Sequence, residues 1–402
     1  MNPLQNVGVD VNNLRETAEN GSVAAQYFLG MCYMTGLNTR QDQGEGLQWI
    51  KRAAEGGWRE AQFMLGQCLH FGTGMQADPA GSLDWYEKAA TQGHEAARIV
   101  VATLLLQGRG VAKDPVRARD WLRQAMDEGS RKAAVALGRL HEDGIGGERD
   151  LEMARQCFRF AAEEGDVEGM YSLALALDPG TAEAPEAAEA MEWLERAAEQ
   201  GQPLALYELG RRLVTQIGDE AEVARGATLL ARAADAGVPL AHYVLGLLHA
   251  DARLVEADAG TKAVQHLRKG ADAGLVEAMV ALGSLHYQGG VVPRDVEAAQ
   301  PVLERAARQG AATAAFLLGM IALNERGDAE AALRWNRQAA AAGHAQARYN
   351  LACQLADGRG GMADRVEAAR LFADLAAGEG DLAEAAAQAL TALEPGGVAA
   401  AE

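Results

Sequence analysis

Apolar residues recur along this chain at helical spacing, in segments bounded by glycines. In the stretch 93–129 this spacing predicts an amphipathic helix over 94–106, which we call helix A. Gly108 suits the left-handed residue that ends such a helix. Asp114 and Pro115 then begin a second helix, helix B, as its N-cap and first helical residue. The sequence therefore predicts two helices joined by a short turn.

This pair of helices is repeated along most of the chain. Each repeat has an anchor glycine at the end of helix B and a Leu-Gly pair, or its alanine variant, eight and nine residues further on. The anchors are Gly21, Gly57, Gly93, Gly129, Gly165, Gly201, Gly237, Gly274, Gly310, Gly343 and Gly380, spaced by 33 to 37 residues and most often by 36. A fixed period in this range is typical of a stacked array whose units contact only their neighbours. We therefore expect an all-α array over residues 12–393 with capping helices at 12–20 and 381–393, a flexible N-terminus at 1–11 and a disordered tail at 394–402.

Small residues at fixed positions indicate how the helices pack. Alanine stands four residues after nine of the anchors, and a Gly or Ala follows five residues later, so helix A can approach its neighbour closely. Tryptophan stands eight residues before five anchors, and we expect these large rings to fill the space between consecutive pairs. The five are Trp49, Trp85, Trp121, Trp193 and Trp335.

Charge and cysteine content narrow the range of partners. With 37 Lys and Arg against 56 Asp and Glu, the net charge is -19, which opposes binding along a nucleic-acid backbone and favours basic proteins or peptides. The four cysteines form no C-x-x-C pair, and we expect reduced, buried thiols. No stretch approaches the roughly 20 apolar residues of a membrane span, and residues 1–20 do not resemble a signal peptide. We therefore expect no membrane insertion and a cytoplasmic protein, or a periplasmic one if a leader was removed; the oligomeric state stays open.

The residues that could carry catalysis or bind a metal are better explained by the repeats. Glycine-rich turns such as 144–147 and 358–361 follow helices rather than strands and lack the Lys-Ser/Thr of a phosphate-binding loop. Three histidines occupy the position of Tyr33 in the first repeat, none of the eight lies in an H-x-x-x-H pair, and His94 and His344 are expected as exposed helix starts. No Ser or Cys has a base that the repeat geometry would bring near it. We expect neither enzyme activity, nor a metal site, nor a cofactor.

The complete repeat follows the pattern A-x-x-x-L-G-x-x-Y/H-x-x-G-x-G-V-x-x-D-x-x-x-A-x-x-W-x-x-x-A-A-x-x-G, and residues 130–165 and 275–310 match most of it. This pattern resembles the Sel1-like repeat, a relative of the tetratricopeptide repeat, over about residues 12–393. The resemblance implies a right-handed α-solenoid of about ten helix-turn-helix repeats. It also implies an adaptor or scaffold role in signalling, secretion, envelope or degradation complexes, with no common reaction.

In solenoids of this kind the A helices line the inner, concave wall. By analogy with the tetratricopeptide repeat, the partner-facing residues stand three, six, ten and thirteen after each anchor. We therefore expect a non-enzymatic scaffold that binds a protein or peptide in this groove, where Arg139 and Arg211 would supply positive charge. Partial core packing is the alternative for the aromatic residues at the sixth position, and Trp58 is a further possible exposed contact. The groove candidates are Tyr27, Met31, Phe63, Gln67, Arg139, Tyr171, Tyr207, Arg211, Tyr243, Leu247, Ser284 and Met320.

A cysteine-rich branch of the same family suggests a second interpretation. It would make the chain an envelope or periplasmic ligand-binding or hydrolytic protein of the penicillin-binding kind. The repeats of that branch are each closed by a disulfide, and this chain has no cysteine pair within any repeat. Covalent labelling by a fluorescent penicillin would distinguish the two, because labelling has no place in the scaffold interpretation.

The fifth repeat lacks the glycine turn and has Pro179 and Pro185 in its place, so we predict a weak joint at residues 177–187. Because units contact only their neighbours, helix ends beside this joint should exchange their amide hydrogens faster than the helices of 130–165. Hydrogen exchange followed by mass spectrometry measures the difference. Uniform protection, with one unfolding transition and no soluble half-fragment, would show that the array behaves as one body.

Overall fold

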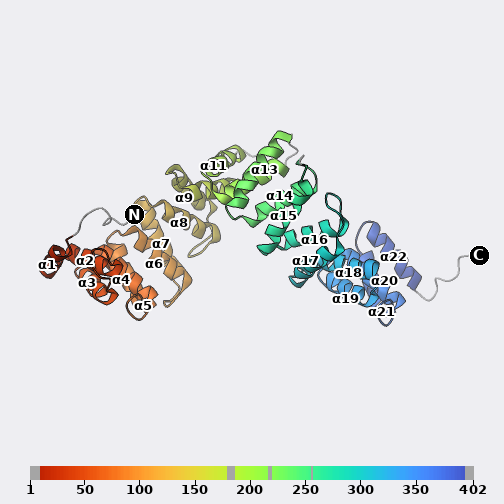
Figure 1. The fold of residues 1–402 in the computed structure, drawn as a ribbon, viewed down its shortest axis with the longest axis horizontal. Helices are drawn as coiled ribbons and strands as arrows, with labels where there is room; N and C mark the ends of the chain where they lie inside the picture. The colour runs from red at the N-terminus through yellow and green to blue at the C-terminus, as the bar shows by residue number, and fades with distance from the viewer. Residues whose placement is uncertain (1–9, 179–185, 216–219, 255–256, 394–402) are drawn as a thin grey trace, which may run out of the picture. The chain divides into compact units, whose positions relative to one another are not determined.

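The computed structural model describes residues 10–178, 186–215, 220–254 and 257–393, and these are helical without any strand (Figure 1). The chain divides into two compact units between Gln202 and Pro203. The first unit holds α1 (Val11–Glu19), α2 (Val23–Thr35), α3 (Gln43–Glu55), α4 (Arg59–Phe71), α5 (Pro79–Thr91), α6 (Glu95–Gln107), α7 (Pro115–Asp127), α8 (Arg131–Asp143), α9 (Leu151–Glu163), α10 (Val167–Leu177) and α11 (Ala187–Glu199). The second holds α12 (Pro203–Thr215), α13 (Glu220–Asp235), α14 (Pro239–Ala250), α15 (Ala259–Asp272), α16 (Val276–Gln288), α17 (Val296–Arg308), α18 (Ala312–Arg326), α19 (Ala329–Ala341), α20 (Ala345–Asp357), α21 (Arg365–Ala376) and α22 (Asp381–Leu393).

The order of the helices confirms the predicted all-α array. The first helix, α1, caps the start, ten A/B pairs run from α2 and α3 to α20 and α21, and α22 closes the array. Even-numbered helices from α2 onward are therefore A helices, and the odd-numbered helices that follow them are B helices. The expected tail at 394–402, residues 1–9 of the expected flexible N-terminus and residues 179–185 of the predicted joint lie outside the described residues.

The helix ends follow the chemistry expected from the sequence. The carboxylate of Asp114 accepts the backbone N–H three residues on at 3.0 Å, and equivalent aspartates cap six other B helices at 2.8 to 2.9 Å. At the end of α3 the N–H groups of Gly57 and Trp58 donate to the carbonyls of Ala54 and Ala53, which is the Schellman arrangement. All eleven anchor glycines have φ between 79° and 95°, a region that strains any other residue.

Besides the packing of each B helix on the next A helix, some A helices of successive repeats contact each other directly. Within each unit every helix packs against its neighbours in the sequence. The substantial contacts between next-but-one helices of the described chain all join A helices, for example α8 with α10 and α14 with α16. The A helices of neighbouring repeats therefore touch one another directly within each unit.

Two neighbouring positions of helix B differ in how deeply they are buried. Trp49 and Trp193 are buried as expected, but Trp85, Trp121 and Trp335 are only half-buried. In these three repeats the ring packs against the core but stays partly exposed, so the expectation that it fills the space between pairs is met only in part. The residue after each tryptophan is at most 3% exposed: Ile50, Tyr86, Leu122, Leu194 and Asn336. One residue along a helix is a rotation of about 100°, and this rotation turns the next side chain fully toward helix A.

The glycine of the Leu-Gly pair in helix A makes room for this enclosed side chain of helix B. A Cβ atom on Gly138 of α8 would lie 2.5 Å from the Cε1 atom of Phe158 in α9. A Cβ atom on Gly66 of α4 would lie 2.8 Å from the ring of Tyr86 in α5. The two helices of a repeat reach their observed separation because the glycine of helix A has no side chain.

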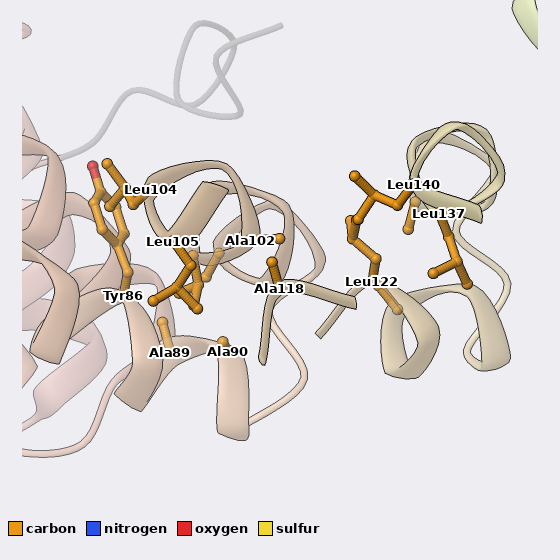
Figure 2. Packing of buried hydrophobic residues seen from close by; sticks show 14 of the residues in the cluster. Tyr86, Ala89, Ala90, Ala102, Leu104, Leu105, Ala118, Leu122, Leu137 and Leu140 are labelled. Carbon is orange, nitrogen blue, oxygen red and sulfur yellow. The ribbon is translucent and has the colours of Figure 1, made fainter. Parts of the chain in front are cut away.

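Buried side chains of the consecutive helices α5 to α9 form one core cluster in the first unit. Figure 2 shows Tyr86 of α5, Leu105 of α6 and Leu122 of α7 in one cluster that extends to Leu137 of α8. Alanines such as Ala102 fill the places where the helices are too close for larger side chains. Each pair of helices therefore shares its core with the next pair, as a stacked array requires.

Two histidines cap A helices in place of serine or aspartate. The Nδ1 atom of His94 accepts the backbone N–H of Ala97 at 3.2 Å, and His344 caps its own helix at the same distance. Each ring is half-buried and stacks on a phenylalanine of the preceding repeat with centroids 4.4 Å apart: Phe63 for His94 and Phe316 for His344. The expectation of exposed helix starts is wrong, because stacking covers one face of each ring. Burial lowers the pKa of both histidines.

We predict that Gly138→Ala lowers the free energy of unfolding by about 1 to 3 kcal/mol, because the new methyl group overlaps Phe158. Adding Phe158→Leu should restore part of this loss by making room. Gly44→Ala is the matched control, since Gly44 is an exposed helical glycine without a close contact, and it should be neutral or stabilising. Urea unfolding measures all three. Equal losses for Gly138→Ala and Gly44→Ala would contradict the packing argument.

The next prediction concerns the pH dependence of stability. The folded pKa of His94 is lowered, so the unfolded chain binds more protons below its ordinary pKa of about 6.5, and stability is lost as the pH falls. His94→Asn supplies a cap that does not titrate and should reduce the slope of unfolding free energy against pH between about 7.5 and 5. Ser22→Asn exchanges one cap without a charge for another and should leave the slope unchanged. An unaltered slope in His94→Asn would show that this ring does not contribute.

Candidate functional site

Two hollows lie on the A-helix face at equivalent places in the repeat, one in each unit. The first, of about 530 Å³, opens between α6 and α8, and the second, of about 400 Å³, opens across α14, α16 and α18. In both, one wall comes from residues two, three, six and seven after an anchor, and the other from the first residues of the next A helix. The same surface feature therefore arises twice from the same repeat positions.

The first hollow has an apolar floor and a charged rim. Ile99 and Val100 form its floor. On the rim, Glu95 accepts a hydrogen bond from the hydroxyl of Ser130 at 2.5 Å, and Arg131 donates to a backbone carbonyl at 3.0 Å. Lys132 is exposed at the same rim. This hollow can take an apolar group whose neighbours carry charge of either sign.

The second hollow is largely apolar. Tyr243, Val276 and Val280 line it together with Ala281, and Glu277 is its one ionisable carboxyl group. Burial, with a smaller contribution from the carboxylate of Glu277, raises the pKa of the Tyr243 phenol, which therefore stays protonated at neutral pH. The hollow offers a phenol hydroxyl and a carboxylate at the edge of an aliphatic surface.

The structure brings together only part of the predicted groove. Residues three and six after an anchor glycine line the hollows. Among the groove candidates named from the sequence, however, only Tyr243 lines one of them. Tenth positions line neither hollow, and the second and seventh positions, which sequence reasoning missed, line both. The sequence feature that could have indicated these positions is the small or short apolar residue at the seventh position, such as Val100 or Ala281. The other candidates are half-buried except for the exposed Arg139: Tyr27, Met31, Phe63, Gln67, Tyr171, Tyr207, Arg211, Leu247, Ser284 and Met320.

The two arginines expected to supply positive charge are both ion-paired. Arg139 pairs with Glu168 of the next A helix. Arg211 binds Glu208 through two hydrogen bonds of 2.6 and 3.1 Å, and Arg212 binds the same carboxylate. Burial opposes the ionisation of Glu208, but the hydrogen bonds from the two arginines outweigh it and lower its pKa. The expected local positive charge is therefore largely neutralised within the chain.

Trp58, the possible exposed contact, is neither fully exposed nor fully buried. Its ring is half-buried against the cluster around Ile50 and Leu65. The Nε1 atom of the indole is buried without a hydrogen-bond partner in the described residues. Most of the ring therefore packs on the core, and only part of it is available to a partner.

Histidines cluster at one place outside the hollows. His242 and His249 of α14 lie beside His266 of α15, and the Nδ1 atoms of His242 and His266 are 3.0 Å apart. Burial, followed by the two neighbouring histidines, lowers the pKa of His266 to about 4. No group of three or more His, Cys, Asp or Glu side chains in the described residues is arranged to hold a metal ion.

The cysteines are all free thiols. Cys32, Cys68 and Cys157 are buried and Cys353 is half-buried. Burial raises the pKa of each thiol, that of Cys157 to about 11, so they are poor nucleophiles at neutral pH. The disulfide-closed repeats of the cysteine-rich branch are therefore not found in this chain.

Comparison with known proteins assigns the repeats. The model of the Sel1 repeat matches ten segments: residues 23–58, 59–94, 96–130, 131–166, 167–202, 203–238, 239–275, 276–310, 312–344 and 345–378. A protective antigen of uropathogenic Escherichia coli with an SLR fold is 29% identical, covers 96% of this chain and 82% of its own, and superposes with a TM-score of 0.74. A Sel1 repeat protein from Oxalobacter formigenes is 31% identical over 78% of this chain and 91% of its own, with a TM-score of 0.64. No curated protein gives a significant match.

These matches fit the helices one repeat at a time, because each matched segment holds one A helix and the B helix that follows it. Proteins built from such repeats are generally protein-interaction scaffolds. None of the described helices combines the length and the apolar character needed to cross a bilayer. The chain belongs to the Sel1 repeat family.

Proposed function

We propose that this chain is a non-enzymatic scaffold that binds a protein or peptide on its A-helix face. The observation that carries the proposal is the repetition of a hollow of 400 to 530 Å³ at equivalent positions of the two units. A hollow that recurs from the same repeat positions is a property of how the A helices are spaced, so partner-binding subsites follow from the fold itself. Concave, partly apolar sites with a few polar groups are the usual form of binding pockets.

The two hollows suit different side chains of a partner. The first combines an aliphatic floor with Glu95, Lys132 and Asp166, and it suits a long amphipathic side chain such as lysine or arginine. The second, around Tyr243 and Val280, suits an aliphatic or aromatic side chain. Each hollow can therefore select its own residue type, and selectivity comes from their combination.

The charge of the chain supports the same class of partner. The net charge of -19 attracts basic segments and speeds their association. The arginines of the A face do not oppose this, because Arg139 and Arg211 are paired with glutamates. We propose a basic protein segment that also carries apolar residues. The half-buried aromatic side chains at the sixth position would extend its contact surface beyond the hollows.

A photo-crosslinking experiment tests the location. A photoreactive residue is placed at the exposed Ala96 or Thr313 in the two hollows, and at the exposed Asp120 or Glu297 on B helices as controls. Crosslinked partners are then identified from the native host. We expect the hollow positions to capture a common partner that the B-helix positions do not capture. Capture from the B helices alone would place the interaction on the other face.

For the partner so identified, we predict that Thr313→Trp weakens binding by about tenfold or more, about 1.4 kcal/mol, because the ring fills the second hollow. Thr313 is exposed, so the melting temperature should stay the same. Asp120→Trp adds the same ring to an exposed site on α7 and should leave the affinity unchanged. Titration calorimetry measures both. Equal affinities for the two variants would contradict a role of this hollow.

A further inference from the structure

The histidine cluster between α14 and α15 contains two ring nitrogens that face each other. The Nδ1 atoms of His242 and His266 are 3.0 Å apart, their ring centroids are 5.2 Å apart, and the rings are inclined by 43°. Both side chains are half-buried, so solvent reaches the pair. The ring of His249 also stacks on His266, with centroids 5.8 Å apart and planes inclined by 17°.

Both histidines replace residues with packing or capping roles in other repeats. His266 stands eight residues before its anchor, where five other repeats have tryptophan. His242 stands five residues after its anchor, where Gln26, Gln62 and Arg98 donate to the last turn of the preceding B helix at 3.0 to 3.2 Å. The two replacements occur in the same repeat and contact each other, so they act as a pair.

The separation of the two nitrogens fits a shared metal ion. Imidazole binds divalent transition metals at about 2.0 to 2.1 Å, so two nitrogens on one ion are about 2.9 Å apart at a right angle and about 3.3 Å apart in a tetrahedron. The observed 3.0 Å lies between these values. A modest rotation of the two rings would direct both lone pairs at one ion, and water would complete its coordination.

The surroundings are mixed in charge. Asp235 lies on the side of His242 and favours a cation there, whereas Lys269 opposes it. Lys262, near His266, is paired with Asp258 at 3.3 Å. The same repeat lacks the glycine turn: Ala252 takes its place with φ 52°, a left-handed conformation that strains alanine. A link between α14 and α15 would therefore hold together a pair of helices whose own turn is unfavourable.

We propose that His242 and His266 form a two-histidine site for a divalent transition metal of the Cu²⁺, Ni²⁺ or Zn²⁺ class. The site joins the A and B helices of one repeat. Affinities follow the usual order in which Cu²⁺ binds such nitrogen ligands most tightly. This proposal does not depend on partner binding at the hollows.

The test uses the full chain, freed of metal with a chelator and then titrated with Ni²⁺ while thermal unfolding is followed. His266→Trp and His242→Gln restore residues that other repeats have at these positions, so both variants should fold. We expect Ni²⁺ to raise the melting temperature of the unaltered chain by mass action, and each variant to lose about tenfold or more in affinity. Cu²⁺ at one equivalent should show an electron paramagnetic resonance spectrum with two imidazole nitrogens.

His286→Leu is the matched control, because His286 lies on another A helix where other repeats have leucine, and it should bind metal like the unaltered chain. Circular dichroism confirms that each variant is folded. Retained binding in the double variant His242→Gln/His266→Trp would overturn the proposal. Absence of saturable binding in the unaltered chain would do the same, and would leave the pair as a hydrogen bond between two neutral rings.

Discussion

At the glycine of each Leu-Gly pair, the backbone of helix A lies directly against a side chain of helix B. The ring of Phe158 occupies the space that a Cβ atom on Gly138 would need, and the ring of Tyr86 does the same at Gly66. Because the two helices of a repeat are so close, the alanines at the neighbouring positions suffice to fill the space toward the next repeat. The A helices that line the second hollow, α14, α16 and α18, all carry this glycine, whereas at the first hollow α8 carries it and α6 has Ala102 in its place.

The fold could be predicted from the sequence because its signals are local. A capping aspartate such as Asp114 acts within a few residues of its own position, and so does a glycine that ends a helix. Because the repeat recurs ten times, each of these signals is seen many times in the sequence. The rotation of helix B about its own axis is not a local property. It is set by contact with helix A, and this explains why Leu122 is enclosed while Trp121 is half-buried. The hollows depend on distances between helices of successive repeats, so the sequence indicated their face but not their lining.

Side-chain charge was the least predictable part of the candidate site. Residue type does not reveal whether an arginine is paired, and Arg139 and Arg211 both are. Along the B helices, arginines and glutamates thirty residues apart join successive repeats: Arg117 with Glu87 at 2.5 Å, Arg159 with Glu189 at 2.9 Å and Arg337 with Glu367 at 3.5 Å. Such exposed pairs contribute about 1 kcal/mol or less each. They nevertheless hold these long charged side chains of the B helices in contacts within the chain.

Residues that differ from the repeat pattern are most informative where two of them contact each other. Asn336 stands where other repeats enclose an apolar side chain, and it bonds Gln354 at 2.8 Å. Both amides are buried, at 3% and 6% exposure, so this pair belongs to the core between α19 and α20. His242 and His266 also replace the usual residues and also meet, but solvent reaches both rings. Burial therefore separates the two cases: a polar pair sealed in the core is limited to structure, whereas a reachable pair of imidazoles can exchange its mutual contact for a ligand.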